Sequence, residues 1–211
     1  MESTGVAIQM QGGVPPPNVQ GLPPGLQYLA GLTEINIHQH LDMLEDTDCC
    51  TRQLCGPARP FNMNITDNNF QPLISLYRPL RCQASFLWCC YLQEMDIMSP
   101  PGLSVGGLKQ IWTPWKPKFQ VHDAQQTPLF QIDGECCFCC PCTDIMFTIT
   151  DISKGQQIGE IVKHWGGCRE IFGGVNDFKV TFPGDLDVMS KALLLGATFL
   201  IDFNYFEPKK N

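Results

Sequence analysis

The chain has 211 residues, of which 44% are hydrophobic and 17% are charged, and its formal net charge is −7. This length and apolar content predict one domain with a buried core and a tail. The negative charge argues against nucleic acid as a partner, because phosphate contacts need a concentrated basic surface. The first residues, MEST, show no secretory signal, so the 12 cysteines are expected to be reduced, acylated or metal-bound in the cytosol.

Residues 1–25 form the first predicted region. They contain Gly12-Gly13, three prolines at 15–17 and Pro23-Pro24, a composition that buries too little apolar surface to order itself. We predict a flexible head, with possible protein partners along its proline-rich sequence. The remaining regions are a domain over 26–207 and a tail over 208–211.

Short segments with period-two alternation follow from Leu26 onward. Apolar residues alternate with polar ones and are separated by turn residues, which is typical of strands joined by tight turns. An antiparallel meander of this kind removes its edges by closing into a barrel or sandwich. The predicted strand residues are Ile35, Ile37, Phe61, Met63, Ile65, Leu73, Ile74, Leu76, Phe119, Val121, Phe130, Ile132, Ile145, Phe147, Ile149, Ile158, Ile161, Phe178, Val180 and Phe182.

The most apolar segment lies at residues 188–206. Its uninterrupted apolar part, residues 192–201, would extend over roughly 15 Å as a helix, about half of a ~30 Å hydrocarbon layer. A longer span would include Lys191, Asp202 and Asn204, which are costly in lipid. We therefore favour a buried central helix over 186–206, with a single membrane pass as the alternative. An all-β shell with one late apolar helix predicts that the helix fills the shell.

Several motifs together resemble the phospholipid scramblase family, in its cytofacial, palmitoylated form. The resemblance implies a mainly β, tubby-like antiparallel barrel around a hydrophobic C-terminal helix. It also implies calcium-activated, ATP-independent movement of phospholipids between leaflets at the cytoplasmic face of the plasma membrane. The motifs are PPGLQYL at 23–29, RPLRC at 78–82, LQEM at 92–95, PPG at 100–102, PKF at 117–119, KHW at 163–165, FPGDLDV at 182–188 and FLIDF at 199–203.

Three departures from the family pattern affect these expectations. Two or three strands that follow the segment 38–45 in the family are missing here, which predicts an incomplete barrel. Gly174 and Asn176 replace two aspartates of the family's calcium segment, leaving Asn176, Asp177, Asp185 and Asp187 as a weak calcium set. Glu160 replaces a lysine in the stretch that matches the family's nuclear-import signal, which argues against import by that route.

The cysteines provide the second group of candidate sites. Cys89 and Cys90 lie among aromatic residues and match the family's palmitoylated run, and the alternative is a buried strand. A second cluster allows zinc binding completed by Cys49, Cys50 and Cys55, further acylation, or unligated thiols. Its members are Cys136, Cys137, Cys139, Cys140 and Cys142.

The histidines and tryptophans add no catalytic constellation. None of His38, His40, His122 and His164 has an evident nucleophile partner, and His164 is predicted to be a packed or hydrogen-bonded core residue. Core packing is also the expected role of the tryptophans, with interface anchoring as the alternative. They are Trp88, Trp112, Trp115 and Trp165.

The function predicted from the sequence is a lipid scramblase rather than an enzyme, with Ca²⁺ as cofactor and phospholipids as partners. It would be lipid-anchored, single-pass, or both. Two alternatives remain at this stage. One is a membrane-recruited tubby-like adaptor that moves no lipid, and the other is a cytosolic, cysteine-rich zinc protein.

Overall fold

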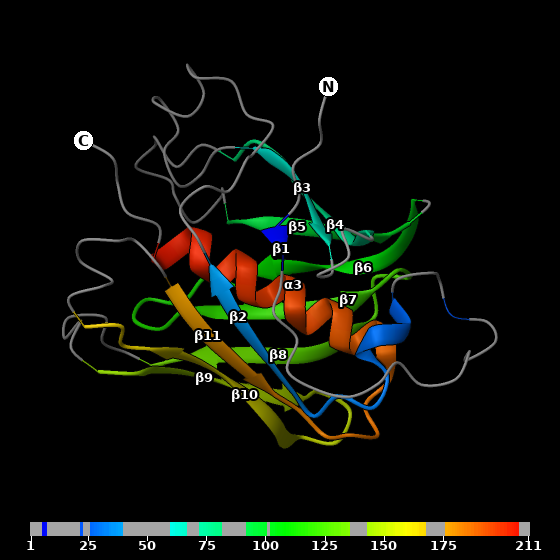
Figure 1. Ribbon diagram of the computed structural model, residues 1–211. Helices are drawn as coiled ribbons and strands as arrows, with labels where there is room; N and C mark the ends of the chain where they lie inside the picture. The colour runs from blue at the N-terminus through cyan, green and yellow to red at the C-terminus, as the bar shows by residue number, and fades with distance from the viewer. Residues whose placement is uncertain are drawn as a thin grey trace.

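The computed structural model describes residues 6–7, 22, 26–39, 60–66, 72–81, 92–100, 102–135, 143–167 and 176–206. One long helix lies inside a curved sheet (Figure 1). The elements are β1 (Val6–Ala7), η1 (Leu26–Leu29), β2 (Glu34–Gln39), β3 (Phe61–Thr66), β4 (Pro72–Arg78), β5 (Glu94–Ser99), β6 (Leu103–Gln110), β7 (Lys118–Asp123), β8 (Pro128–Gly134), β9 (Ile145–Asp151), β10 (Gln156–His164), β11 (Asn176–Thr181) and α3 (Val188–Tyr205).

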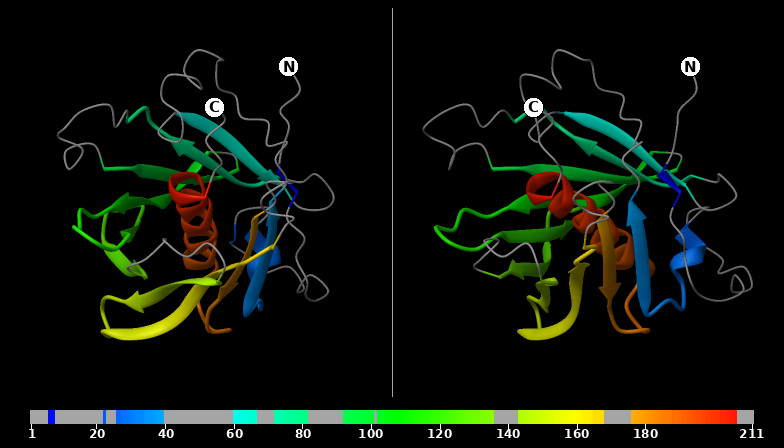
Figure 2. Two further views of the ribbon diagram at one scale, coloured as in Figure 1. Left: turned by 90° about the vertical axis from the view of Figure 1, so that its left-hand side faces the viewer. Right: turned by 60° about the vertical axis from the view of Figure 1, so that its left-hand side comes forward.

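The strands form one sheet in the order β1-β3-β4-β5-β6-β7-β8-β9-β10-β11-β2. β1 is parallel to β3, and all other neighbouring strands are antiparallel. Among the strands that the structure describes, β1 and β2 are the two borders, so the sheet curls around α3 without closing (Figure 2). The predicted mainly β fold, an incomplete antiparallel barrel around a C-terminal helix, is confirmed.

Alternation along the strands produces the core. On β3, Phe61, Met63 and Ile65 are buried, whereas the residues between them are more exposed. β9 and β11 show the same pattern. Because successive strand side chains point to opposite faces, each strand contributes one apolar row to the inside of the sheet and one polar row to the outside. The strands predicted from period-two alternation are therefore present.

β5 and β6 lie in a stretch for which the alternation predicted no strand. Gly106 and Gly107 interrupt the apolar pattern of β6, and Gly106 has a φ of 148°. A Cβ on Gly106 would lie 2.2 Å from the backbone oxygen of His122 on the neighbouring strand. The glycine therefore permits a close approach of two backbones, and this requirement removed the sequence signal on which strand prediction depends.

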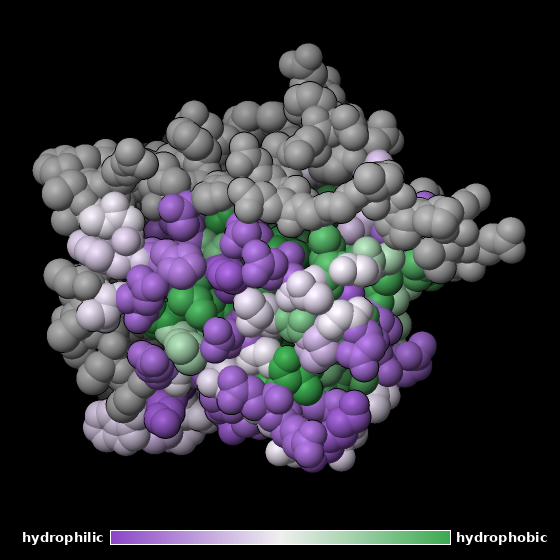
Figure 3. Space-filling view, turned by 60° about the horizontal axis from the view of Figure 1, so that its bottom comes forward, coloured by the Kyte–Doolittle hydropathy of each residue, from purple (hydrophilic) through white to green (hydrophobic). Residues whose placement is uncertain are grey.

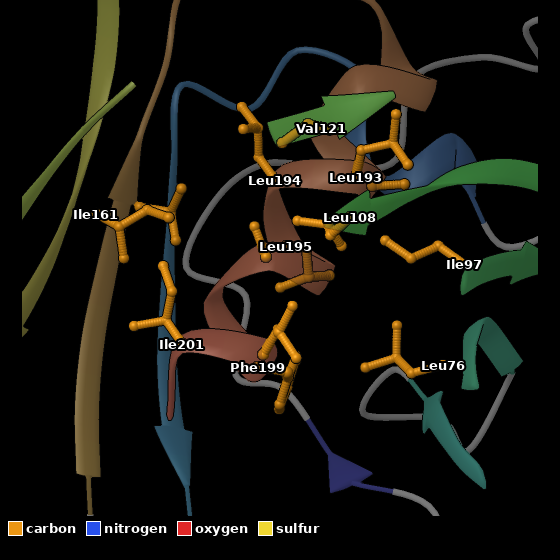
Figure 4. Close-up of a cluster of buried hydrophobic side chains, with 14 of the residues drawn as sticks. Leu76, Ile97, Leu108, Val121, Ile161, Leu193, Leu194, Leu195, Phe199 and Ile201 are labelled. Atoms are coloured by element: carbon orange, nitrogen blue, oxygen red, sulfur yellow. The ribbon is translucent and has the colours of Figure 1, made fainter. Parts of the chain in front are cut away.

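α3 fills the sheet. Its residues 190–203 are all buried. The helix begins at Val188, two residues after the predicted start, because the Asp187 side chain accepts a hydrogen bond from the Ser190 backbone nitrogen at 3.0 Å and caps it. Figure 4 shows apolar side chains of α3 pointing toward different strands, with Leu193 and Leu195 near Leu108 and Ile201 near Ile161. In the part of the chain described here, no helix combines the length and apolar character that a membrane crossing needs.

Polar side chains hold both ends of α3. At its start, Lys191 Nζ donates to the Gly184 carbonyl oxygen at 3.2 Å and lies 5.4 Å from the centre of the Phe182 ring. Burial lowers the pKa of Lys191. Asp187 and Asp185 lie in the same turn and raise that pKa in part. The cation that argued against a membrane span is therefore accommodated inside the protein.

Three hydrogen bonds hold the other end. Asn176 Nδ2 donates to Asp202 Oδ1 at 2.7 Å, Arg78 Nη2 donates to Asn204 Oδ1 at 2.9 Å, and Gln110 Nε2 donates to the Tyr205 hydroxyl at 3.1 Å. Burial raises the pKa of Tyr205 to about 12. Lys191, Asp202 and Asn204, the polar residues that argued against a membrane span, thus each have a partner on the sheet or in the turn before the helix, and these partners fix the axial position of α3.

Arg78→Leu tests this arrangement. Arg78 is 1% exposed and also donates from Nε to Gln93 Oε1 at 3.0 Å, so its removal takes a hydrogen-bond donor from the buried Gln93 and from the partly buried Asn204. We expect the free energy of unfolding to fall by about 1–3 kcal/mol, measured by chemical denaturation. Arg81→Leu is the matched control, because Arg81 forms a partly exposed ion pair with Glu94 and should cost less than about 1 kcal/mol. Equal losses in the two variants would contradict the assignment.

Candidate functional site

Antiparallel pairing places alternate connections at opposite ends of the sheet. The pairs Phe61 with Arg78 and Gln39 with Asn176 lie at the end where α3 finishes. Figure 2 (left) looks onto this end, with the end of α3 coloured red. We call it the tryptophan end. The connections that begin and end there are β2–β3 (residues 40–60), β4–β5 (79–93), β6–β7 (111–117), β8–β9 (135–144) and β10–β11 (165–175).

These five connections contain all 12 cysteines and all 4 tryptophans of the chain. The opposite connections, at 67–71, 100–102, 124–127, 152–155 and 182–187, contain neither residue type. The tryptophans are Trp88, Trp112, Trp115 and Trp165, and the cysteines are Cys49, Cys50, Cys55, Cys82, Cys89, Cys90, Cys136, Cys137, Cys139, Cys140, Cys142 and Cys168. All candidates for acylation and all tryptophans thus belong to connections whose two ends lie at the tryptophan end.

The predicted acylation and zinc residues lie outside the described residues, so the structure gives no geometry for Cys89, Cys90 or the cluster at 136–142. Their flanking residues are placed. Arg81 and Leu92 bracket the segment that contains Cys89 and Cys90, and Arg81 Nη1 donates to the Leu92 carbonyl oxygen at 3.3 Å. The two ends of this segment are therefore held together at the tryptophan end.

The β6–β7 connection presents two tryptophans to solvent. Trp112 is 50% exposed and Trp115 is 77% exposed. The expectation that the tryptophans pack in the core is therefore wrong for Trp112 and Trp115, and the alternative of anchoring at an interface stays a prediction. The loop's base is held to its neighbours, because the Ile111 nitrogen donates to the Lys118 oxygen at 2.8 Å and the Gly134 nitrogen donates to the Pro117 oxygen at 2.8 Å.

The opposite end has a different chemistry. Asp123 Oδ1 accepts hydrogen bonds from the backbone nitrogens of Gln125 and Thr127, and Asp151 Oδ1 accepts from Ser153. These carboxylates stabilise turns. Figure 3 shows one face of the molecule on which hydrophilic side chains dominate and apolar ones lie in separate groups. The connections at this opposite end are thus short turns that carboxylates stabilise.

The four residues predicted to bind calcium do not meet. Asn176 and Asp177 begin β11 at the tryptophan end, while Asp185 and Asp187 follow β11 at the opposite end. A strand of six residues covers roughly 20 Å. Asn176 is also bonded to Asp202, and Asp187 caps α3. Within the described ranges, no group of three or more His, Cys, Asp and Glu side chains is arranged to hold a metal ion. The four residues therefore do not fit a single calcium site.

His164 and Asp144 form a surface pair at the tryptophan end. His164 Nδ1 lies 2.8 Å from Asp144 Oδ2, and Asp144 Oδ1 accepts from the Trp165 backbone nitrogen at 2.8 Å. These hydrogen bonds, first that from Trp165, lower the pKa of Asp144. The predicted hydrogen bonding of His164 is confirmed, but its predicted place in the core is wrong, because both side chains are about half exposed.

Comparison with known proteins identifies the family. A family model described as Scramblase matches residues 32–208. The chain belongs to the scramblase family. It is 42% identical over 212 residues to phospholipid scramblase 2 of Bos taurus, covering 88% of this chain and 72% of that protein. It is 41% identical over 212 residues to phospholipid scramblase 1 of Homo sapiens, covering 88% of this chain and 66% of that protein. No solved structure matches it.

The scramblase-family region includes every described strand from β2 onward and all of α3. Both ends of the curved sheet and the contacts that hold α3 thus belong to the matched part of the chain. The resemblance read from the sequence motifs is confirmed. Membership supports a lipid transporter type of protein that acts in association with membranes.

His122 is an unusual residue in this member of the scramblase family. It lies on β7 opposite Gly107, is 3% exposed, and neither of its ring nitrogens has a hydrogen-bond partner among the residues that the structure describes. Burial, and next the charge of Lys109, lower the pKa of His122. The charges of Asp96, Asp123 and Glu94 act in the opposite direction but do not outweigh burial. A neutral imidazole is therefore enclosed here without its usual partners.

This burial predicts a pH dependence of stability. The folded pKa of His122 lies below its ordinary value of 6.5, so the unfolded chain binds the proton more readily and stability falls as the pH drops below about 6.5. His122→Leu should raise the free energy of unfolding by about 1 kcal/mol and flatten its slope between about pH 7 and pH 5.5. Burial also raises the pKa of Asp96, so the folded state binds this proton more readily than the unfolded chain does. At lower pH, Asp96 therefore makes stability rise as the pH falls, opposite to the effect of His122. His164→Leu is the exposed control, and a slope unchanged in His122→Leu would contradict the prediction.

Proposed function

We propose that this protein moves phospholipids between bilayer leaflets, without ATP and in response to calcium, at the cytoplasmic face of the plasma membrane. Its membership of the scramblase family, with relatives named phospholipid scramblases, carries the proposal. The concentration of all cysteines and tryptophans at one end supports a specific orientation, with the tryptophan end toward the lipid.

Acylation at Cys89 and Cys90 provides the anchor in this proposal. One acyl chain holds a protein only reversibly, so two chains, or one chain with another apolar contact, are needed for stable attachment. The segment with both cysteines begins and ends at the tryptophan end, beside the connection that exposes Trp112 and Trp115. Two acyl chains and two indole rings would therefore act on the same side of the molecule.

The barrier to lipid movement is the transfer of a polar headgroup through hydrocarbon. Because α3 is buried and bonded at both ends, we infer that it stays inside the sheet and does not itself carry the headgroup. The protein would lower the barrier from one leaflet, where its anchored end disturbs lipid packing and thins the bilayer locally. α3 then has a mechanical role, because it keeps the sheet curved and the connections of the tryptophan end together.

Calcium responsiveness is the least constrained part of the proposal. Hard cations take about six to eight oxygen ligands, and the four residues that the resemblance suggests are divided between the two ends of β11. Asp177 lies at the end proposed to face the lipid, whereas Asp185 and Asp187 lie away from it. Asp177→Asn should therefore reduce a calcium response more than Asp185→Asn does.

A membrane-recruited adaptor that moves no lipid is the second candidate. The observation that favours it is the complete burial of α3 over residues 190–203, because a helix held in this way cannot interact with lipid. This candidate shares the anchor and the orientation with the first. It differs only in the absence of transbilayer movement.

The experiment uses full-length protein purified with its acyl chains and reconstituted into vesicles with a fluorescent lipid in one leaflet. We expect calcium-dependent loss of leaflet asymmetry above a protein-free control. Cys89→Ser with Cys90→Ser should reduce both this activity and the membrane-bound fraction in cells, because the anchor is lost. Cys82→Ser with Cys168→Ser is the matched control for loss of two thiols, because neither is a candidate for acylation or zinc binding, and it should leave both unchanged.

Three results separate the alternatives. Membrane recruitment with unchanged asymmetry would favour the adaptor. Wild-type protein with free thiols at Cys89 and Cys90 would contradict the anchor. Near-stoichiometric zinc in the purified protein, measured by elemental analysis, would instead support a metal site among the cysteines of residues 136–142.

A further inference from the structure

The β6–β7 connection, residues 111–117, combines exposed aromatic rings with positive charge in an acidic protein. The sequence from residue 97 to residue 122 contains Lys109, Lys116 and Lys118 and no Asp or Glu, although the whole chain has a net charge of −7. Trp112 is 50% exposed and Trp115 is 77% exposed, and Lys116, next to Trp115, is also exposed. This local composition is the reverse of that of the chain as a whole.

Hydrogen bonds within the chain fix the backbone conformation of this connection. Its base is joined to β8 by the hydrogen bond from the Gly134 nitrogen to the Pro117 oxygen, and its two strands by that from the Ile111 nitrogen to the Lys118 oxygen. The Thr113 hydroxyl donates to the Lys116 oxygen and closes the turn itself. Pro114 and Pro117 restrict the backbone further. Hydrogen bonds and prolines therefore fix the conformation of the loop that carries the exposed rings, which keeps the entropy cost of binding low.

Two tryptophans beside a lysine match the chemistry of the lipid headgroup region. Indole rings favour the boundary between water and hydrocarbon, and cations near an anionic leaflet are attracted to lipid phosphates. Lys118 is partly neutralised by Asp133, 3.5 Å away, so Lys116 is the cation best placed for this contact. Glu135 and Asp144 are exposed at the same end, so the attraction is local to the loop and the indoles must provide most of the binding.

We propose that residues 111–117 insert into the interface of a phospholipid bilayer that contains anionic lipids. Trp112 and Trp115 enter the boundary region, and Lys116 contacts lipid phosphates. The inference rests on the membrane association proposed above and specifies the contact that sets the orientation. A bilayer is the occupant, because the connections that begin and end at the same end of the sheet as this loop contain every cysteine of the chain, including the candidates for acylation.

The test removes the acyl anchor so that the loop is measured alone. The full chain with Cys89→Ser and Cys90→Ser is mixed with vesicles of phosphatidylcholine and phosphatidylserine, and binding is measured by sedimentation. Adding Trp112→Ala and Trp115→Ala should lower the partition coefficient by about tenfold or more, since each large ring buries apolar area at the interface. Lys116→Glu should weaken binding to these vesicles but not to vesicles of phosphatidylcholine alone.

A matched control lies at the opposite end of the fold. Leu103 is 54% exposed and Ile152 is 38% exposed, so Leu103→Ala with Ile152→Ala removes exposed apolar surface away from the loop, although less of it than the two indoles provide. This variant should keep the partition coefficient within about twofold, a difference well under about 1 kcal/mol. Since all four residues are exposed, thermal unfolding should confirm that each variant remains folded. An equal loss in both double variants would overturn the inference.

Depth provides an independent readout. With Trp88→Phe and Trp165→Phe, the remaining fluorescence comes from Trp112 and Trp115, and lipids brominated near the headgroup should quench it. No quenching, or unchanged binding after loss of both tryptophans, would overturn the inference and leave the loop as a protein-docking surface.

If binding depends on the tryptophans but the acylated protein moves no lipid, the inference stands and the proposed scrambling fails. If the acylated protein moves lipid after loss of both tryptophans and binding is unchanged, the proposed scrambling stands and the inference about residues 111–117 fails.

Discussion

The burial of α3 inside the curved sheet is the interaction on which the rest of the structure depends. Residues 190–203 are buried without a break, so the helix needs apolar contacts all around it rather than on one face. A twisted antiparallel sheet can supply them only by curling around the helix. Close contacts show how tight this arrangement is, since a Cβ on Gly196 would lie 2.2 Å from Ile97 Cδ1 on β5.

Polar contacts then determine where along its axis the helix lies. Lys191 bonds to the turn before the helix, and Asp202, Asn204 and Tyr205 bond to the sheet at the other end. Moving α3 into lipid would leave these groups without partners, at a cost of several kcal/mol for each unsatisfied group. Therefore α3 and the sheet act as one body. In the proposed orientation, this body contacts lipid through the end of the sheet and not through the buried helix.

The strand order gives the sheet two ends whose connections differ in composition. Because the meander alternates direction, residues far apart in the sequence, such as Cys49, Trp112 and Cys168, belong to connections at the same end. The opposite end contains turns stabilised by Asp123, Asp151 and Asp187. The proposed anchor, the exposed tryptophans and the membrane association expected of the scramblase family are consistent with one orientation.

The sequence predicted those parts of the fold whose signal is local. Alternation identified β3, β9 and β11, and the length of the apolar segment together with Lys191 and Asp202 identified a buried helix. β6 was missed because a close backbone approach requires glycine at position 106, whereas β5 was missed although its buried Met95 and Ile97 alternate with more exposed residues. Exposure of Trp112 and Trp115 could not be predicted, since it depends on where the connection between two strands lies.

The candidate calcium residues show a different limit. Asn176 and Asp187 are close in the sequence, but Asn176 begins β11 and Asp187 follows its end, so the strand carries them to opposite ends. Conversely, the cysteine-containing connections are dispersed in the sequence and share one end. Closeness in the sequence therefore did not predict which residues lie at the same end of the sheet. The direction of each strand does predict it, once the strand order is known.

Lipid-embedded carbene labelling of the vesicle-bound, acylated protein tests the central claim most directly. The photoactivatable group lies in the bilayer, and mass spectrometry identifies the residues that it modifies. The account predicts modification within residues 111–117 and none within residues 190–203, because α3 stays enclosed by the sheet while the tryptophan end meets the lipid. Modification of α3, with residues 111–117 unlabelled, would contradict it.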